Sequence, residues 1–277
     1  MGKVGTWVAL LTSMVGAVVS AAPVASAEPP LTLTGYVALG DSYSSGFGTG
    51  VYDVSSLRCF RSPLGYPPLW AGEHHPASFR FAACAGAMTA DVLATQISAL
   101  RPSTGLVTIT IGGNDAGFGP VMRTCTLALS DHACFEAVDA AESFTQTVVR
   151  DRLAGAYAAI RANAPHARVI VLDYPRLFDL APGCADPLVP NLARRRKLNE
   201  GADVLDDVIH SVSQRPGFRF TEVRGRFTGH GVCSAEPWIN GPSLPPLAGA
   251  YHPNQIGYRE GYLLALDALT QRSIAAD

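Results

Sequence analysis

Tyr36-Val37-Ala38-Leu39-Gly40-Asp41-Ser42 takes the chain from an apolar run directly into a Gly-Asp-Ser turn. An apolar run of this kind is typical of a strand buried in an α/β sheet. A serine at the exit of such a strand is where an α/β enzyme presents a nucleophile. Ser42 is therefore the first candidate catalytic residue, although Asp and Ser also occur at ordinary strand-to-helix caps.

The rest of the chain alternates apolar, β-branched segments with segments of helical spacing. The predicted strands are Val37–Gly40, Phe79–Ala83, Val107–Ile111, Val169–Leu172 and Phe218–Val223, and the predicted helices are Thr89–Leu100, Phe135–Ala164, Leu192–Ser213 and Gln255–Ser273. This alternation predicts an α/β fold with a mostly parallel five-stranded sheet covered on both faces, a single three-layer α/β/α domain. Two irregular regions, Gly46–Pro68 and Gly229–Tyr251, are expected near the carboxyl ends of strands, where open α/β sheets bind ligands.

The first residues have the pattern of a secretion signal. Lys3 precedes an apolar stretch from Trp7 through Val19, and Ala25-Ser26-Ala27 is the small-x-small pattern that signal peptidase recognises. A single membrane anchor is the alternative, but the stretch is short and interrupted by Ser and Gly. We expect residues 1–27 to be removed after Ala27, leaving a secreted, extracellular domain of residues 28–277.

The composition gives no indication of a polyanion partner. The formal net charge is −2 and 16% of the residues are charged, so nothing indicates nucleic-acid binding. The one basic cluster, Arg194-Arg195-Arg196-Lys197, is followed by Asp203, Asp206 and Asp207 on the same predicted helix. We interpret it as a solvated helix face.

The cysteine count indicates disulfides, because six cysteines follow a secretion signal. We predict nearest-neighbour pairing, Cys59–Cys84, Cys125–Cys134 and Cys184–Cys233. A metal site is the alternative, but there is no Cys-x-x-Cys pair and the histidines are scattered, so no metal or cofactor is expected. Six histidines have polar or loop contexts and are expected at the surface: His74, His75, His132, His166, His210 and His230.

Three further segments complete a candidate site with Ser42. They are Gly86, the Gly112-Gly113-Asn114-Asp115 turn, and His252-Pro253-Asn254. Ester hydrolysis needs a nucleophile, a base and donors for the oxyanion, and these segments contain such groups. Taken singly, the turn and the histidine could be an ordinary turn and a helix start. The Gly-x-Ser-x-Gly elbow of α/β-hydrolases is absent, because Ser44 replaces its second glycine.

In this order, the segments resemble the blocks of the SGNH, or GDSL-type, hydrolase family, and the cysteine spacing is similar to that of its secreted actinobacterial lipases, esterases and phospholipases. The resemblance implies a flavodoxin-like fold and a serine ester hydrolase without a cofactor. It implies that Ser42 is the nucleophile and His252 the base. Backbone N–H groups of Ser42 and Gly86, with the Asn114 amide, would form the oxyanion hole.

The chain departs from the family pattern at one position. The acid usually found three residues before the histidine is replaced by Gly249. We therefore expect a Ser42–His252 dyad whose imidazole is oriented by a main-chain carbonyl near Gly249 or Ala250. The rival is a triad completed by Glu236. Asp41 and Asp115 are expected to have structural roles.

The substrate is less well specified. The resemblance implies a carboxylic ester, with a phospholipase A-type or carbohydrate O-acetyl esterase activity as alternatives. A non-catalytic secreted binding protein is a different class, which the complete set of site residues disfavours. We expect a monomer that makes transient contact with a lipid surface. Four aromatic residues could line an apolar acyl groove or belong to the core: Phe47, Phe118, Trp238 and Tyr251.

Overall fold

The centre of the fold is a five-stranded sheet in which all four strand pairings are parallel, in the order β2-β1-β3-β4-β5. This computed structural model describes residues 1–3, 34–184, 186–242 and 249–271, so the apolar stretch and cleavage site of the predicted secretion signal lie outside the described residues. The predicted α/β sheet is confirmed, with β2 and β5 shorter than expected. The strands are β1 Tyr36–Gly40, β2 Phe79–Phe81, β3 Leu106–Thr110, β4 Arg168–Leu172 and β5 Arg219–Thr221.

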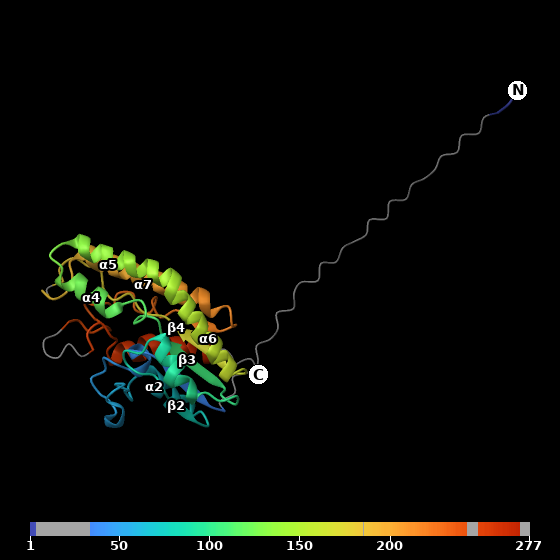
Figure 1. Ribbon diagram of the computed structural model, residues 1–277, viewed down its shortest axis with the longest axis horizontal. Coiled ribbons are helices and arrows are strands. Elements are labelled where there is room, and N and C mark those ends of the chain that lie inside the picture. Colours follow the sequence, from blue (N-terminus) through green and yellow to red (C-terminus); the bar gives the residue numbers. More distant parts are fainter. Residues whose placement is uncertain (4–33, 185, 243–248, 272–277) are drawn as a thin grey trace.

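Helices cover both faces of the sheet, as Figure 1 shows, with α5, α6 and α7 on one side and α2 and the carboxyl-terminal helices on the other. The helical elements are α1 Ser42–Ser45, η1 Val54–Ser56, α2 Tyr66–His74, α3 Thr89–Asp91, η2 Val92–Gln96, η3 Ile97–Ala99, α4 Phe118–Leu127, α5 Asp131–Phe144, η4 Thr145–Val149, α6 Arg150–Asn163, α7 Leu192–Ser213, η5 Gly257–Leu263 and α8 Leu264–Thr270. The four predicted helices are present. Those over 89–100, 135–164 and 255–273 are divided into shorter elements in their described parts, and only 192–213 is a single helix.

Besides the short elements α1 and η1, two longer helices, α2 and α4, were not predicted from the sequence. In α2, Pro67 and Pro68 occupy the first turn, where a missing backbone N–H costs no hydrogen bond, so the prolines do not prevent the helix. The predicted loop Gly46–Pro68 therefore overlaps the first three residues of α2. Helix α4 begins after Gly117, whose φ is 84°. In the sequence, a glycine at this place is typical of a turn, so the start of the helix was not recognised.

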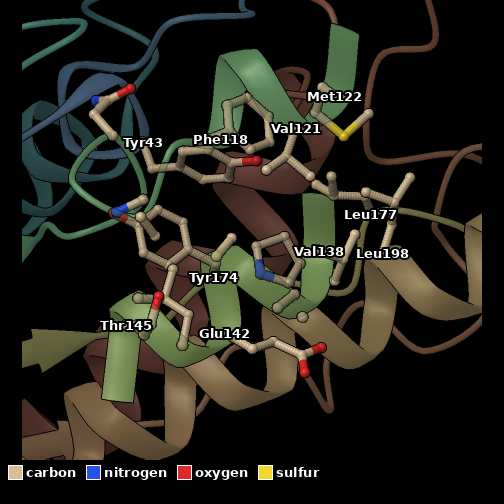
Figure 2. A pocket seen from close by; sticks show the side chains of 18 of the residues that line it. Tyr43, Phe118, Val121, Met122, Val138, Glu142, Thr145, Tyr174, Leu177 and Leu198 are labelled. Carbon is tan, nitrogen blue, oxygen red and sulfur yellow. The ribbon is translucent and has the colours of Figure 1, made fainter. Parts of the chain in front are cut away.

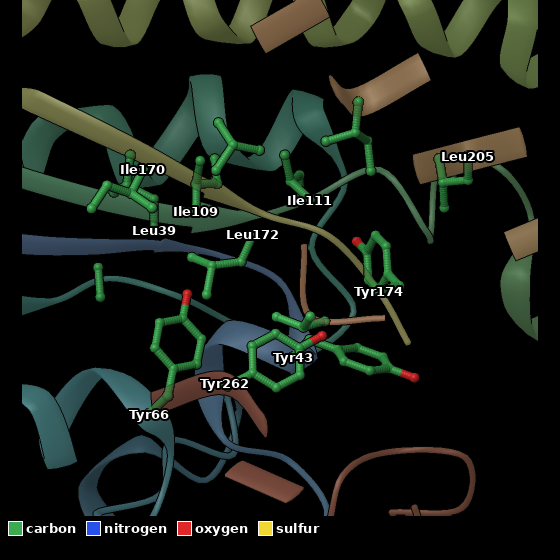
Figure 3. Packing of buried hydrophobic residues seen from close by; sticks show 14 of the residues in the cluster. Leu39, Tyr43, Tyr66, Ile109, Ile111, Ile170, Leu172, Tyr174, Leu205 and Tyr262 are labelled. Carbon is green, nitrogen blue, oxygen red and sulfur yellow. The ribbon is translucent and has the colours of Figure 1, made fainter. Parts of the chain in front are cut away.

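The core lies on both faces of the central strands, and every residue of β1 and β3 is buried. Figure 3 shows Tyr66 and Tyr262 on one side of the sheet and Ile111 and Leu205 on the other. The rings of Tyr66 and Tyr262 stack with centroids 5.4 Å apart. Strands buried on both faces read as continuous apolar runs, which is why β1 and β3 were recognisable in the sequence.

The six cysteines form three disulfides: Cys59–Cys84, Cys125–Cys134 and Cys184–Cys233. These are the pairs that nearest-neighbour pairing predicts. Cys59–Cys84 ties the loop after α1 to the segment that carries Gly86, and Cys125–Cys134 ties α4 to α5. Two bridges therefore fix segments that border the carboxyl end of the sheet.

Two surface predictions were wrong in part. Arg194 and Arg195 are buried rather than solvated, because their guanidinium groups donate to the carbonyl oxygens of Cys125 and Asp179, respectively. His74 and His230 are half-buried against the rings of Trp70 and Trp238, whereas the other four histidines outside the site are exposed, as expected. Among the described residues, no helix combines the length and apolar character that a membrane span requires.

Candidate active site

Ser42 stands on a tight turn between β1 and α1. A Cβ atom at Gly40, where φ is 121°, would lie 2.4 Å from the carbonyl oxygen of Thr110, so this position requires glycine. Asp41 caps α1 by accepting a hydrogen bond from the Tyr43 N–H at 3.0 Å. Ser42 is the first residue of the helix, where a backbone N–H has no intrahelical acceptor.

His252 reaches Ser42 across 210 residues of sequence, with Nε2 2.7 Å from the Ser42 Oγ. The other ring nitrogen, Nδ1, lies 2.8 Å from the carbonyl oxygen of Ala250. Because a carbonyl oxygen only accepts hydrogen bonds, Nδ1 carries the proton and Nε2 is the acceptor for the serine hydroxyl. The imidazole is therefore held in the tautomer that a general base for Ser42 requires.

The surroundings of His252 keep its ring neutral. The side chain is buried among the rings of Tyr43, Phe47 and Phe118, with ring centroids 4.9, 4.9 and 6.1 Å from the imidazole. Burial disfavours the imidazolium and lowers the pKa of His252 from 6.5 to about 4, although the hydrogen bond to Ala250 acts in the opposite direction. A neutral imidazole at physiological pH is available to take a proton.

The segment that carries His252 is fixed by main-chain hydrogen bonds and by the nucleophile turn itself. Asn240 donates its N–H to the His252 carbonyl at 2.9 Å and accepts from the Tyr251 N–H at 2.8 Å. The Tyr43 hydroxyl donates to the Tyr251 carbonyl at 2.6 Å. Tyr43, directly after the serine, therefore positions the residue directly before the histidine.

The turn after β3 and the Gly86 loop are joined by three hydrogen bonds. The Asn114 side-chain amide donates to the Ala87 carbonyl at 2.9 Å. Asp115 accepts from the N–H and the hydroxyl of Thr89 at 2.8 and 2.7 Å. In the described part of the chain, the Gly86 N–H has no hydrogen-bond acceptor. The two predicted oxyanion segments are thus braced together, with the Gly86 N–H free.

The two ring nitrogens of His252 face Ser42 and Ala250, and neither faces Glu236 or Asp41. The Glu236 side chain is exposed, and its backbone carbonyl faces Nδ1 of His230. Asp41 accepts from the Tyr174 hydroxyl, and burial raises the pKa of its carboxyl to about 7. Because the one N–H of the neutral His252 ring points at Ala250, the imidazole has no proton left to donate to a carboxylate.

A largely apolar cavity of about 100 Å³ opens beside Ser42 and Asn114. Figure 2 shows side chains of α4 facing side chains of α5 and α7 across it. Near the serine the wall includes Tyr43 and Tyr174, and farther away it includes Val138 of α5 and Gly201 of α7. The largely apolar lining beside Ser42 suits a hydrocarbon group.

The aromatic residues predicted to line a groove have different surroundings. Phe118 lines the cavity. Phe47 packs on the imidazole, Trp238 packs on Phe227, and Tyr251 packs on Phe178. Phe118 therefore lines the groove, whereas Trp238 and Tyr251 pack with the core, the alternative that the sequence left open, because the cavity lies between helices rather than under the loops.

Fold and site together define the protein as a serine hydrolase built on a three-layer α/β/α domain. The chain belongs to the GDSL-like lipase/acylhydrolase family, whose model matches residues 38–260, and it is a serine ester hydrolase. It is 42% identical to "Lipase 1" of Streptomyces coelicolor over 263 residues, 94% of this chain and 97% of that protein.

Two solved structures are also similar over most of the chain. Phospholipase A1 from Streptomyces albidoflavus NA297 has a TM-score of 0.82 and 43% sequence identity, covering 85% of this chain and 98% of that one. The extracellular lipase of Streptomyces rimosus has a TM-score of 0.80 and 44% identity, covering 85% and 99%. These similarities agree with the fold and the enzyme class that the sequence predicts.

Proposed function

We propose that the protein hydrolyses carboxylic esters of lipids through an acyl-enzyme on Ser42, with His252 as the base of a Ser-His dyad. The observation that carries the proposal is the 2.7 Å contact between the Ser42 Oγ and the His252 Nε2, in a tautomer that accepts the serine proton. The neutral state of His252 supports the same role.

In the acylation step, the Ser42 Oγ attacks the ester carbonyl carbon while its proton moves to the His252 Nε2. The tetrahedral intermediate then collapses, and the leaving alkoxide takes that proton and departs as the alcohol. In deacylation, His252 takes a proton from water, the resulting hydroxide attacks the acyl carbon, and the proton returns to Ser42. No oxidant, metal or external acid is needed for this balance.

Three donors would stabilise the negative oxygen of the intermediate. They are the Ser42 N–H at the start of α1, the Gly86 N–H, and the hydrogen of the Asn114 amide that is not given to Ala87. Preorganised donors act mainly on the transition state, where the charge develops. The brace between Asn114 and Ala87 supports this arrangement, because it fixes the amide next to the Gly86 loop.

The dyad replaces a carboxylate with the Ala250 carbonyl. A carbonyl dipole fixes the tautomer and the ring orientation without a full negative charge. Burial of His252 among aromatic rings makes its imidazolium costly, so the base is less basic than in an acid-supported triad. The Ala250 contact at 2.8 Å supports the dyad over a triad with Glu236.

The cavity between α4, α5 and α7 is proposed as the acyl site. Apolar side chains line most of it, and its opening contains Ser42 and Asn114, so an ester carbonyl can sit at the serine while its acyl chain enters the cavity. A phospholipid is the second candidate substrate, because one similar structure is a phospholipase A1. A carbohydrate O-acetyl ester fits less well, because an acetyl group leaves this cavity empty.

Contact with a lipid surface is supported by two leucines. Leu127, 69% exposed, ends α4, and Leu129, 105% exposed, lies on the turn between α4 and α5, two helices that line the cavity. Exposed apolar side chains next to a binding site are typical of apolar interaction surfaces. We propose that a monomer, exported and cleaved after Ala27, acts at such surfaces. Export is supported by similarity to the extracellular lipase of S. rimosus.

The test is a comparison of the purified protein with Ser42→Ala on two substrate sets. The first is a p-nitrophenyl ester series from acetate to palmitate, and the second is vesicles of phosphatidylcholine with different acyl chains at the two glycerol positions. We expect turnover that rises beyond the acetate and is abolished by Ser42→Ala. Cleavage of one phospholipid position would define a phospholipase. Turnover confined to acetate, or unchanged in Ser42→Ala, would overturn the proposal.

A further inference from the structure

The hydroxyl of Tyr174 joins the nucleophile turn to the Asn114 turn. Tyr174 lies two residues after β4, and its side chain is buried. The hydroxyl donates to the Asp41 Oδ2 at 2.5 Å and accepts from the Gly113 N–H at 3.0 Å. One oxygen atom thus bridges the residue before Ser42 and the residue before Asn114.

Each of the two bridged residues controls a group of the proposed chemistry. The second oxygen of Asp41 accepts from the Tyr43 N–H, so this carboxylate sets the start of α1, where the Ser42 N–H is exposed. Gly113 precedes Asn114, so the direction of its peptide group sets where the Asn114 side chain begins. The Tyr174 hydroxyl therefore links the segment of the serine to the segment of the side-chain oxyanion donor.

Tyr174 is itself held from three directions. Its N–H donates to the Asp206 Oδ1 of α7 at 3.0 Å. Its ring packs edge-on against the ring of Tyr43, with centroids 4.9 Å apart, and both residues are labelled in Figure 3. A Cβ atom at Gly113 would lie 3.2 Å from the Tyr174 ring, so glycine allows the close approach. A hydroxyl fixed this well can hold two turns at a set distance.

We propose that Tyr174 is a positioning residue for the oxyanion hole, acting through Asp41 and Gly113 to fix Ser42 relative to Asn114. The inference rests on the proposed function, because it assumes that these groups carry the reaction. Tyr174 also lines the acyl cavity. A role in substrate packing alone would change KM, whereas a positioning role changes kcat, because oxyanion donors act in the transition state.

The experiment is Tyr174→Phe, which keeps the ring and removes one oxygen, measured on a p-nitrophenyl ester of medium chain length. The matched control is Tyr157→Phe, because the Tyr157 side chain is fully buried on α6 and its hydroxyl has no partner in the described structure. Active-site titration with a phosphonate ester gives the fraction of competent enzyme. A butylboronic acid, which forms a tetrahedral adduct on a catalytic serine, reports on the oxyanion hole.

For Tyr174→Phe we expect kcat per active site to fall about 10- to 100-fold, as small misplacements of catalytic groups do, with KM within about threefold. The boronate should bind weaker by a similar factor, and Tyr157→Phe should behave as wild type. A kcat within twofold of wild type, a change confined to KM, or unchanged boronate binding would overturn the inference.

A second variant covers the case in which Tyr174→Phe does not fold. Asp41→Asn keeps an oxygen acceptor for the Tyr43 N–H but replaces the acceptor of the Tyr174 hydroxyl. It should show the same loss in kcat and in boronate affinity, and wild-type values would overturn the inference. Failure of the proposed function is distinguishable, because wild type would then be inactive or Ser42→Ala would stay active.

Discussion

The carbonyl oxygen of Ala250 lies 2.8 Å from Nδ1 of His252, where a triad would have a carboxylate. The chain folds back so tightly here that the acceptor comes from two residues upstream. Tyr251, between them, has φ of 61°, a left-handed conformation that is uncommon outside glycine. The backbone of the histidine segment is thus shaped to bring a carbonyl, rather than a side chain, to the imidazole.

The dyad predicts that Glu236 is dispensable. Glu236→Ala should leave kcat and KM on p-nitrophenyl esters within about twofold of wild type, because the exposed carboxylate has no N–H of the neutral His252 ring to accept from. Steady-state kinetics beside Ser42→Ala provide the measurement. A loss of several orders of magnitude in Glu236→Ala, with the fold intact by circular dichroism, would restore the triad.

The low pKa of His252 predicts activity well into the acid range. A base must be neutral, so protonation of His252 should lower kcat/KM about tenfold per unit below pH 4, whereas any change between pH 8 and pH 5 should come from Asp41, whose pKa is about 7. A histidine with its ordinary pKa would begin to lose activity near pH 6.5. The control is Asp41→Asn, in which the acid limb should stay near pH 4 even though the overall rate falls. An acid limb near pH 6.5 that persists in Asp41→Asn would contradict the burial of a neutral base.

The amide of Asn114 should contribute to the transition state more than to substrate binding. Asn114→Ala should lower kcat about 100- to 1,000-fold with a small change in KM, the usual cost of removing one oxyanion donor. Asn163→Ala is the matched control, since Asn163 lies on α6 and its amide donates to the Ala159 carbonyl. Stopped assays on a short-chain ester give both constants. An increase in KM with kcat unchanged would assign Asn114 to substrate binding.

Gly201 should set the usable length of the acyl cavity. A Cβ atom there would lie 2.9 Å from the Val138 Cγ1, and both residues line the cavity. Gly201→Val should therefore reduce kcat/KM for long-chain esters about tenfold or more while sparing the acetate. Gly155→Val on α6 is the control, because nothing lies within 4 Å of a Cβ atom at Gly155. An equal loss on acetate and palmitate would place the acyl chain elsewhere.

The sheet and the main site residues were predictable because their signals are local. Buried parallel strands have continuous apolar sequences, and Ser42 and Asn114 lie in the turns that follow two such strands. His252 and Gly86 were recognisable through the family resemblance. The order of these segments was enough to place them at one edge of the sheet.

The remaining features depend on tertiary packing, which leaves no local signal. Tyr174 follows β4, but nothing in the sequence shows that its hydroxyl bridges Asp41 and Gly113. The cavity lies between helices, one of which was not predicted, so aromatic residues in loops were the wrong guide to it. The burial of Arg194 depends on the Cys125 carbonyl, a partner 69 residues away.

The central claim is that Ser42 carries the acyl group. The most direct measurement is rapid acid quench of the enzyme with a p-nitrophenyl ester during turnover, followed by peptide mass spectrometry. We predict one acyl group, located on the peptide that contains Ser42 and absent from Ser42→Ala. An acyl group on another residue, or turnover by Ser42→Ala at the wild-type rate, would contradict the account.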